Sequence, residues 1–253
     1  MSTKSDIVFC IEHTSSIMSY FNQIRTTILG ICVKALAAQS DVRIGIIKFR
    51  SRHDAWTTQV YGFTQNIDTI QQMLSNDQLG GGSPDEYEAV GDALHEALNI
   101  QWRIDNNDQI FNEKLVILIT DGAPNGLFTT LNGADPWRIS KKFKENNITL
   151  VVVGVSESIN ECDDFYCALA QKTDGQYIPL VNAGRIIKNI IDWVTNKETT
   201  FNQCFRHIMM KKIEKNSSFR YLSVTDRVNG MINECHTIND IRKIFFNHRV
   251  STG

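Results

Sequence analysis

The segment DIVFCIEHTSS, residues 6–16, contains the pattern that decides the fold of this chain. After the opening aspartate, residues 6–11 form a continuous apolar run, which is typical of a β-strand covered on both faces. The run ends in the carboxylate of Glu12, and the hydroxyl residues Thr14 and Ser16 follow it at alternate positions. An extended turn would aim these three side chains the same way, so the end of this strand is a candidate site.

A helical pattern follows directly. From Ile17 to Ala35, apolar residues recur every three or four positions, which predicts one buried face of a long helix. Thr14 or Ser15 is available to cap its first turn.

The same alternation of strand and helix continues to about residue 196. Strands are predicted at 6–11, 42–49, 57–63, 114–120, 148–155 and 176–181, and helices at 17–35, 67–74, 90–98, 135–147, 163–175 and 183–194. The strand at 57–63 is shorter and alternates in polarity, as expected of an edge strand. The others are mainly apolar, which predicts an α/β fold with a doubly wound, mostly parallel six-stranded sheet and helices on both faces.

The charge is distributed unevenly between two parts of the chain. Residues 1–196 carry 16 Lys and Arg against 23 Asp and Glu, whereas residues 197–253 carry 10 against 5. We therefore expect a domain at 1–196 and a basic, helical C-terminal extension at 197–253. The extension could dock on an acidic face, on a partner or on nucleic acid, but a solvated helical surface explains its charge more simply.

The sequence also indicates a compartment. It has no run of the roughly 18 apolar residues that a membrane span requires. The N-terminus resembles a first strand more than a signal peptide, so we expect a cytoplasmic protein, with the nucleus as an alternative. The six cysteines fit a reducing compartment, and the spacing of Cys162 and Cys167 matches no common zinc motif.

Oxygen-bearing residues gather at the place where this fold binds ligands. In a sheet of order 3-2-1-4-5-6, the first and fourth strands are neighbours at the point where the strand order reverses. Here these strands end in EHTSS (12–16) and TDGAPNG (120–126), and the loop GGGSPDE (80–86) opens at the same edge. The candidate ligands are Glu12, Thr14, Ser16, Ser83, Asp85 and Asp121. Such hard oxygen donors suit Mg²⁺, Ca²⁺ or Mn²⁺ better than zinc.

Together these motifs resemble the von Willebrand factor A domain with its metal-ion-dependent adhesion site. The family pattern D-x-S/T-x-S corresponds to EHTSS, with Thr14 and Ser16 on the hydroxyl positions. GGGSPDEYEAVGDAL resembles its glycine-rich loop and places Ser83 on the third position. LVILITDGAPN resembles its last segment, with Asp121 as the carboxylate. The resemblance covers about residues 5–196 and departs at Glu12, where the family has Asp. The extra methylene extends the carboxylate by about 1.5 Å.

The resemblance implies a binding module rather than an enzyme. In this hypothesis a divalent cation, Mg²⁺ first and Mn²⁺ or Ca²⁺ as alternatives, bridges the site to an acidic side chain of a protein partner. The second hypothesis follows from Glu12: a metal-free scaffold of the same fold that binds partners through helix faces or residues 197–253. A metal-dependent hydrolase is the third, but no Ser-His-Asp spacing supports it, and His13 is expected to point away from the site. We expect no nucleic-acid partner, and the oligomeric state stays open.

Overall fold

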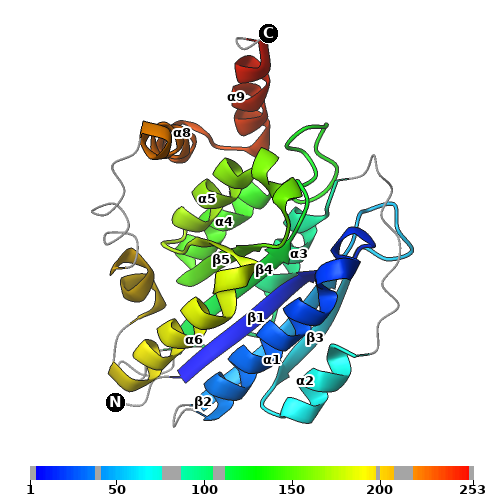
Figure 1. Cartoon of the computed structure of the whole chain (residues 1–253), viewed down its shortest axis with the longest axis vertical. Helices are drawn as coiled ribbons and strands as arrows, with labels where there is room; N and C mark the ends of the chain where they lie inside the picture. Colours follow the sequence, from blue (N-terminus) through cyan, green and yellow to red (C-terminus); the bar gives the residue numbers. More distant parts are fainter. Residues whose placement is uncertain are drawn as a thin grey trace.

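Six strands form one sheet in the computed structural model, which describes residues 4–37, 41–75, 87–104, 112–197, 200–207 and 219–250 (Figure 1). The order β3-β2-β1-β4-β5-β6 is the one expected from the sequence. All neighbouring strands are parallel except β2 and β3, so the antiparallel strand is the predicted edge strand. The strands are β1 (Lys4–Glu12), β2 (Asp41–Phe49), β3 (Thr58–Thr64), β4 (Asn112–Thr120), β5 (Ile148–Gly154) and β6 (Tyr177–Pro179).

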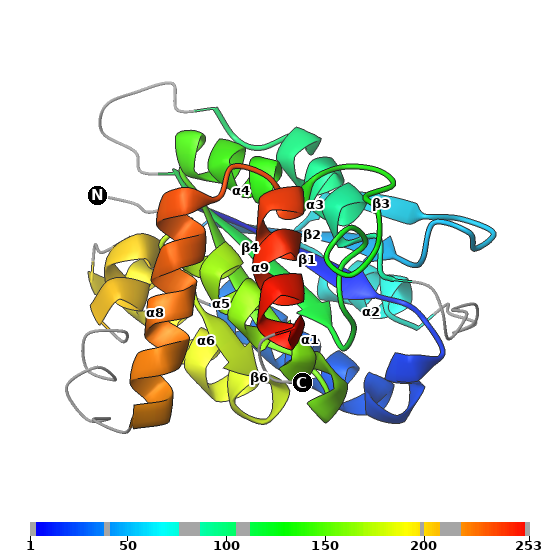
Figure 2. The same cartoon turned by 90° about the horizontal axis from the view of Figure 1, so that it is seen from above.

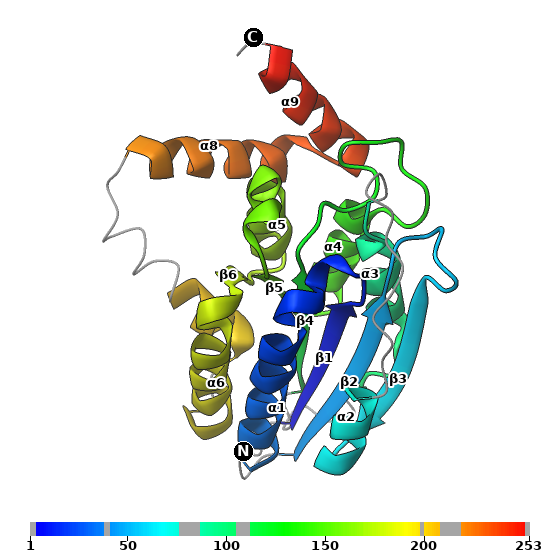
Figure 3. The same ribbon diagram turned by 45° about the vertical axis from the view of Figure 1, so that its right-hand side comes forward.

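Helices cover both faces of the sheet, as predicted (Figure 3). One face carries α1 (Phe21–Ala37), α2 (Ile67–Met73) and α6 (Leu180–Lys197); the other carries α3 (Val90–Asn99), α4 (Pro136–Glu145) and α5 (Asp163–Gln171). Along β1, the side chains of Ile7, Phe9 and Ile11 lie in the core under α1 and α6. Those of Val8 and Cys10 lie in the core under α3, α4 and α5. Side chains alternate across a strand, so two buried faces require the unbroken apolar run seen in the sequence.

Two local predictions were wrong. The helix after β1 begins as a 3₁₀ segment, η1 (Ser16–Tyr20), and Ser15 makes no side-chain capping hydrogen bond. The hydroxyl of Thr14 donates instead to Glu12. The predicted strand 176–181 ends at Pro179, and α6 begins at Leu180 rather than at residue 183.

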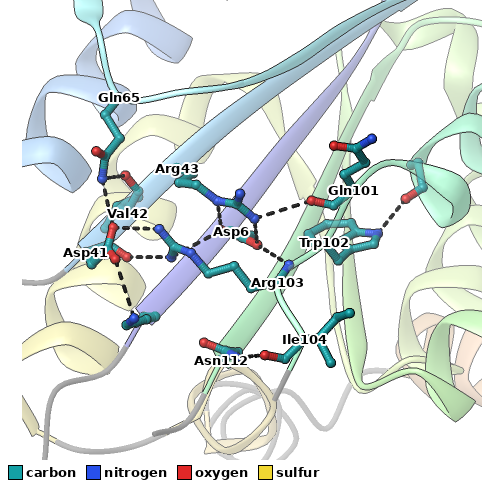
Figure 4. Close-up of polar contacts among 12 residues, drawn as sticks. Asp6, Asp41, Val42, Arg43, Gln65, Gln101, Trp102, Arg103, Ile104 and Asn112 are labelled. Atoms are coloured by element: carbon teal, nitrogen blue, oxygen red, sulfur yellow. Dashed lines mark hydrogen bonds and ion pairs between the residues drawn. The ribbon is translucent and has the colours of Figure 1, made fainter. Parts of the chain in front are cut away.

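An ion-pair network closes the amino-terminal edge of the sheet, opposite the candidate site (Figure 4). The buried carboxylate of Asp6 accepts two hydrogen bonds from Arg43, over 2.9 and 2.6 Å. The backbone N–H of Arg103 also donates to Asp6, while its guanidinium pairs with Asp41. These contacts join β1, β2 and the segment after α3 at one end of the molecule.

The C-terminal part of the chain is helical, as expected. It includes a short helix at residues 201–207, α8 (Phe219–Glu234) and α9 (Ile238–Val250). Figure 2 shows α8 and α9 crossing the molecule beside α5 and the loop after β4. Val228, Met231 and Ile238 are buried in the same core as α4 and α5. The extension is therefore packed onto the sheet domain rather than set apart from it.

Specific polar contacts hold this packing in place. The indole N–H of Trp137 donates to the carbonyl of Cys235 over 2.8 Å. Asp135 caps α4 by accepting from the N–H of Trp137, and it also accepts from the N–H of Ile238 at the start of α9. One carboxylate thus serves the N-termini of two helices, which is favourable because both present unpaired N–H groups.

Two further properties bear on the sequence analysis. All six cysteines are free thiols. Among the described residues, no helix has the length and apolar character needed to cross a lipid bilayer.

Candidate functional site

The carboxyl ends of β1 and β4 bring four of the candidate residues together. Thr14 Oγ1 lies 2.9 Å from Ser16 Oγ, and Ser16 Oγ lies 3.0 Å from Asp121 Oδ1. Glu12 Oε1 lies 2.5 Å from Thr14 Oγ1 and 3.3 Å from Ser16 Oγ. Glu12 and Asp121 are carried by parallel neighbouring strands, so their meeting follows from the strand order.

These oxygens are joined by hydrogen bonds, and their spacing is also that of ligands around a small divalent cation. In an octahedral site with metal–oxygen distances of about 2.0–2.1 Å, neighbouring ligand oxygens lie about 2.9 Å apart. The distances from Ser16 Oγ to Thr14 Oγ1 and to Asp121 Oδ1 match this edge. Glu12, Thr14 and Asp121 are buried, whereas Ser16 is exposed. The group therefore opens to solvent on the side of Ser16.

Imidazole and thiolate ligands take no part in this group. Within the described ranges there is no cluster of three or more His, Cys, Asp and Glu side chains able to hold a metal. Any cation here would need hydroxyl ligands as well as carboxylates, which favours hard cations.

The long side chain of Glu12 reaches the neighbouring strand. Its second oxygen, Oε2, accepts from the hydroxyl of Thr120 over 2.6 Å and from the backbone N–H of Asp121 over 3.1 Å. Thr120, which is fully buried, was not among the predicted site residues. Its position as the last residue of an apolar strand was the only signal, and many core threonines share it.

Burial raises the pKa of the Glu12 carboxyl to about 8, and the nearby charge of Asp121 acts in the same direction. Hydrogen bonds from Thr120 and Thr14 favour the ionised form and oppose this rise. In the absence of a cation, burial first and the repulsion from Asp121 second therefore favour a proton on Glu12.

A third carboxylate, Glu88, reaches this end of the sheet from the segment before α3. Its backbone forms β-bridges with Ser51, just after β2, and with Pro124, in the loop after β4. Glu88 therefore lies between these two segments. A Cβ on Gly122 would lie 3.1 Å from Glu88 Cγ and 3.8 Å from its Oε1, which places the carboxylate beside the residue after Asp121.

The sequence did not single out Glu88. It lies just before the apolar stripe of α3, but three acidic residues precede that helix within four positions, and spacing alone cannot choose between them. The predicted residues Ser83 and Asp85 fall in the segment 76–86, outside the described residues.

Two hydroxyl groups fix the loop that carries Asp121. Ser158 donates to the carbonyl of Asp121 over 2.7 Å, and Tyr166 donates to the carbonyl of Gly122 over 2.8 Å. The pKa of Tyr166 is raised well above its usual value, first by burial and then by neighbouring groups that include Glu12 and Glu88. Tyr166 therefore stays a neutral donor to the carbonyl of Gly122.

His13 takes no part in this convergence. Its ring packs against Phe21 and Trp56, with centroids 5.9 Å away in each case. Its carbonyl accepts from Nε of Arg50 over 3.0 Å. The side chain packs among aromatic rings rather than joining the site, and the sequence analysis expected it to point away.

Comparisons with known proteins agree with this architecture. Residues 6–178 match the von Willebrand factor type A domain. No curated protein matched the chain. Among solved structures, proximal thread matrix protein 1 from the mussel byssus aligns with a TM-score of 0.53 and 17% identity, over 77% of this chain and 46% of its own; it is described as having a "zinc occupied MIDAS motif".

Two bacterial structures share the fold. The pilus adhesin SpaC from Lactobacillus rhamnosus GG aligns with a TM-score of 0.57 and 15% identity, over 76% of this chain and 30% of its own. The conserved hypothetical protein BatB from Bacteroides thetaiotaomicron aligns at 0.50 and 16% identity, over 75% of this chain and 97% of its own. The chain thus spans less than half the length of the mussel and Lactobacillus proteins.

Proposed function

Because the chain belongs to the von Willebrand factor type A domain family, we propose that it is a non-enzymatic binding module that engages an acidic group of a protein partner through a divalent cation. The observation that carries the proposal is the spacing of Thr14, Ser16 and Asp121, whose oxygens stand 2.9 and 3.0 Å apart around the exposed Ser16. This spacing matches neighbouring ligands of an octahedral cation.

Each residue has a distinct role in the proposal. Thr14, Ser16 and Asp121 would hold the cation. Glu12 would orient the two hydroxyls from behind, since its Oε1 accepts from Thr14 and Ser16 while its Oε2 is fixed by Thr120. The cation would supply a positive charge with a free coordination position for the partner's carboxylate.

Glu88 extends the same site. Its buried side chain lies beside Gly122, the residue after Asp121, so it would help to shape the same site. Within the described residues, Glu88 is the side chain by which the segment before α3 would contribute to the cation site. The sequence analysis expected Ser83 to make that contribution.

Isothermal titration with MgCl₂, MnCl₂, CaCl₂ and ZnCl₂ tests the proposal. We expect binding of at least one hard cation to the wild type and its loss in Asp121→Ala. Asp226→Ala, which removes an exposed carboxylate on α8, is the matched control and should bind as the wild type does. Absence of binding to the wild type, or equal binding to Asp121→Ala, would overturn the proposal.

A metal-free scaffold of the same fold is the second candidate, and one observation favours it. Glu12 already accepts hydrogen bonds from Thr14, Thr120 and the N–H of Asp121, so the site is satisfied by its own donors. In that case EDTA would leave the binding of a protein partner unchanged, whereas the favoured proposal requires EDTA to abolish it.

A further inference from the structure

A depression of about 650 Å³ lies between α9 and the loop after β4, the loop that begins with Asp121. It is lined by Phe128, Thr129, Thr130, Arg242, Lys243 and Phe246. Its volume is in the range of small-ligand sites. Figures 2 and 3 show the loop beside the first turns of α9.

The two walls of this depression are fixed to each other. Arg242 donates to the carbonyl of Thr129 over 2.6 Å, and the rings of Phe128 and Phe245 meet edge to face at 5.8 Å. Gly126 adopts a φ of +94°, and a Cβ there would lie 2.7 Å from Leu131 and 3.2 Å from Ile238. Glycine thus lets the loop turn back closely against the start of α9.

The lining of the depression combines exposed aromatic surface with positive charge. Phe246 is 45% exposed, which is unusual for a side chain of its size. Arg242 and Lys243 supply positive charge, and none of the six residues that form the depression is acidic. The Arg242 guanidinium donates to a carbonyl, and Lys243 lies 3.7 Å from Asp240 while its own side chain is 75% exposed.

From this we infer that the depression binds a segment of the protein partner in which an aromatic side chain is flanked by carboxylates. The aromatic ring would pack on Phe128 and Phe246, and the carboxylates would pair with Arg242 and Lys243. The inference rests on the proposed function, because the loop joins this depression to Asp121 and one acidic partner would meet both surfaces.

The aromatic contacts support this continuity. The ring of Tyr87, next to Glu88 in the chain, lies 5.9 Å from that of Phe128, and Phe128 contacts Phe245. A row of three rings therefore runs from the segment before α3, through the loop after β4, to α9. Phe128, the middle ring of this row, also lines the depression, so the row connects the depression to the segment that carries Glu88.

Fluorine NMR of two short peptides tests the inference in the presence of EDTA. The probes are acetyl-Glu-Glu-Phe-Glu-Glu-amide and acetyl-Lys-Lys-Phe-Lys-Lys-amide, each with 4-fluorophenylalanine, added to the full chain. We expect the acidic peptide to show line broadening and the basic peptide none. Equal broadening by both peptides, or none by either, would overturn the inference.

Two variants and one control assign the effect to the depression. Lys243→Glu should lower the affinity for the acidic peptide about fivefold, equivalent to about 1 kcal/mol for a charge contact near the surface. Phe246→Ala should also lower this affinity, because it removes the exposed ring. Lys141→Glu changes the charge by the same amount on α4, at a side chain 74% exposed, and should have no effect. If Lys243→Glu and Lys141→Glu act alike, the inference is wrong.

The outcome is separable from that of the cation proposal. EDTA removes any contribution of a cation, so Asp121→Ala should leave peptide broadening unchanged while it abolishes the heat of cation binding. Sedimentation of the peptide-free chain tests the competing occupant. A dimer that Phe246→Ala disrupts would assign the depression to a second copy of the chain and overturn the partner segment.

Discussion

Thr120 donates its hydroxyl hydrogen to Oε2 of Glu12 over 2.6 Å, across the junction of the two central strands. The register of β1 and β4 ends with Ile11 opposite Ile119, so this contact continues the pairing with side chains where the backbone ladder stops. The extra methylene of glutamate provides the reach. Glu12 is therefore a structural link between the strands as well as a member of the candidate site.

Shortening this link should destabilise the protein. In Glu12→Asp the carboxylate is withdrawn by about 1.5 Å, so Thr120 and the N–H of Asp121 lose their buried acceptor. We expect a loss of about 1–3 kcal/mol in the free energy of unfolding, measured with urea in EDTA. Glu157→Asp, the same change at an exposed position in η2 (Glu157–Glu161), should stay within about 0.5 kcal/mol. An equally small effect at position 12 would show that aspartate reaches both donors.

Glu12 should also make stability depend on pH. Burial raises its pKa from 4.5 to about 8 in the folded protein, so the folded state holds the proton more tightly than the unfolded state. Between these values unfolding releases a proton, and the free energy of unfolding in EDTA falls as the pH rises from about 4.5 to about 8. Glu12→Gln cannot ionise and should lack this decline. Urea titrations at several pH values check it, and parallel curves for the two proteins would contradict it.

The close approach of α3 to the segment just before α4 predicts a position that tolerates no side chain. A Cβ on Gly91 would lie 1.9 Å from the carbonyl oxygen of Ala134. Gly91→Ala should therefore lower the free energy of unfolding by about 2 kcal/mol or more. Gly62→Ala on β3 meets no atom within 4 Å and should change stability by no more than about 0.5 kcal/mol. Thermal or urea unfolding of the pair decides the matter, and similar values for both would refute the steric argument.

Asp135 should couple α4 to the C-terminal extension. Asp135→Ala removes the acceptor for Trp137 and Ile238, and we expect a loss of about 1–2 kcal/mol together with faster amide hydrogen exchange at the start of α9. Asn66→Ala removes the cap of α2, which accepts from Asp68 and Thr69. It should reduce stability without changing exchange in α9. Unchanged exchange in Asp135→Ala would mean that α9 is held by its apolar contacts alone.

The network at the amino-terminal edge should matter for stability and not for cation binding. Asp6→Asn leaves Arg43 and Arg103 without their buried carboxylate, and we expect a loss of about 2–4 kcal/mol, reduced from the fully buried case because Arg43 is 27% exposed. Glu145→Gln breaks an exposed pair with Lys141 and should lose at most about 0.5 kcal/mol. Cation titrations should be unaffected in both, since Asp6 and Glu12 lie at opposite ends of β1.

Much of the fold could be predicted because a strand buried on both faces requires a continuous apolar run in the sequence. The strand at 114–120 is apolar at every position from 115 to 119, and helices such as 135–147 begin with an aspartate cap and a proline. The end of β6 was harder: Leu180 and Val181 suit a strand as well as a helix, and tertiary packing decides between them. The 3₁₀ segment η1, which precedes α1, was not predicted. The sequence suggested Thr14 as a helix cap, whereas its hydroxyl donates to Glu12.

The candidate site also has residues that could be predicted from the sequence and one that could not. Glu12, Thr14, Ser16 and Asp121 could be brought together from the sequence, since they end two strands that the topology makes neighbours. Glu88 could not, because its place depends on bridges to Ser51 and Pro124 that no periodicity records. Side chains that a strand order aligns are predictable, whereas those that an irregular loop delivers depend on three-dimensional packing.

The burial of the C-terminal helices decides where the chain can be cut. The family match ends at residue 178, yet Phe201 and Phe205 lie in one core, and Val228, Met231 and Ile238 in the other. A fragment trimmed to the matched residues would leave the surfaces beneath these side chains, including that of Trp137, open to water. Such a fragment would be prone to aggregation, so a soluble fragment for crystallisation or binding assays should retain residues through at least α9.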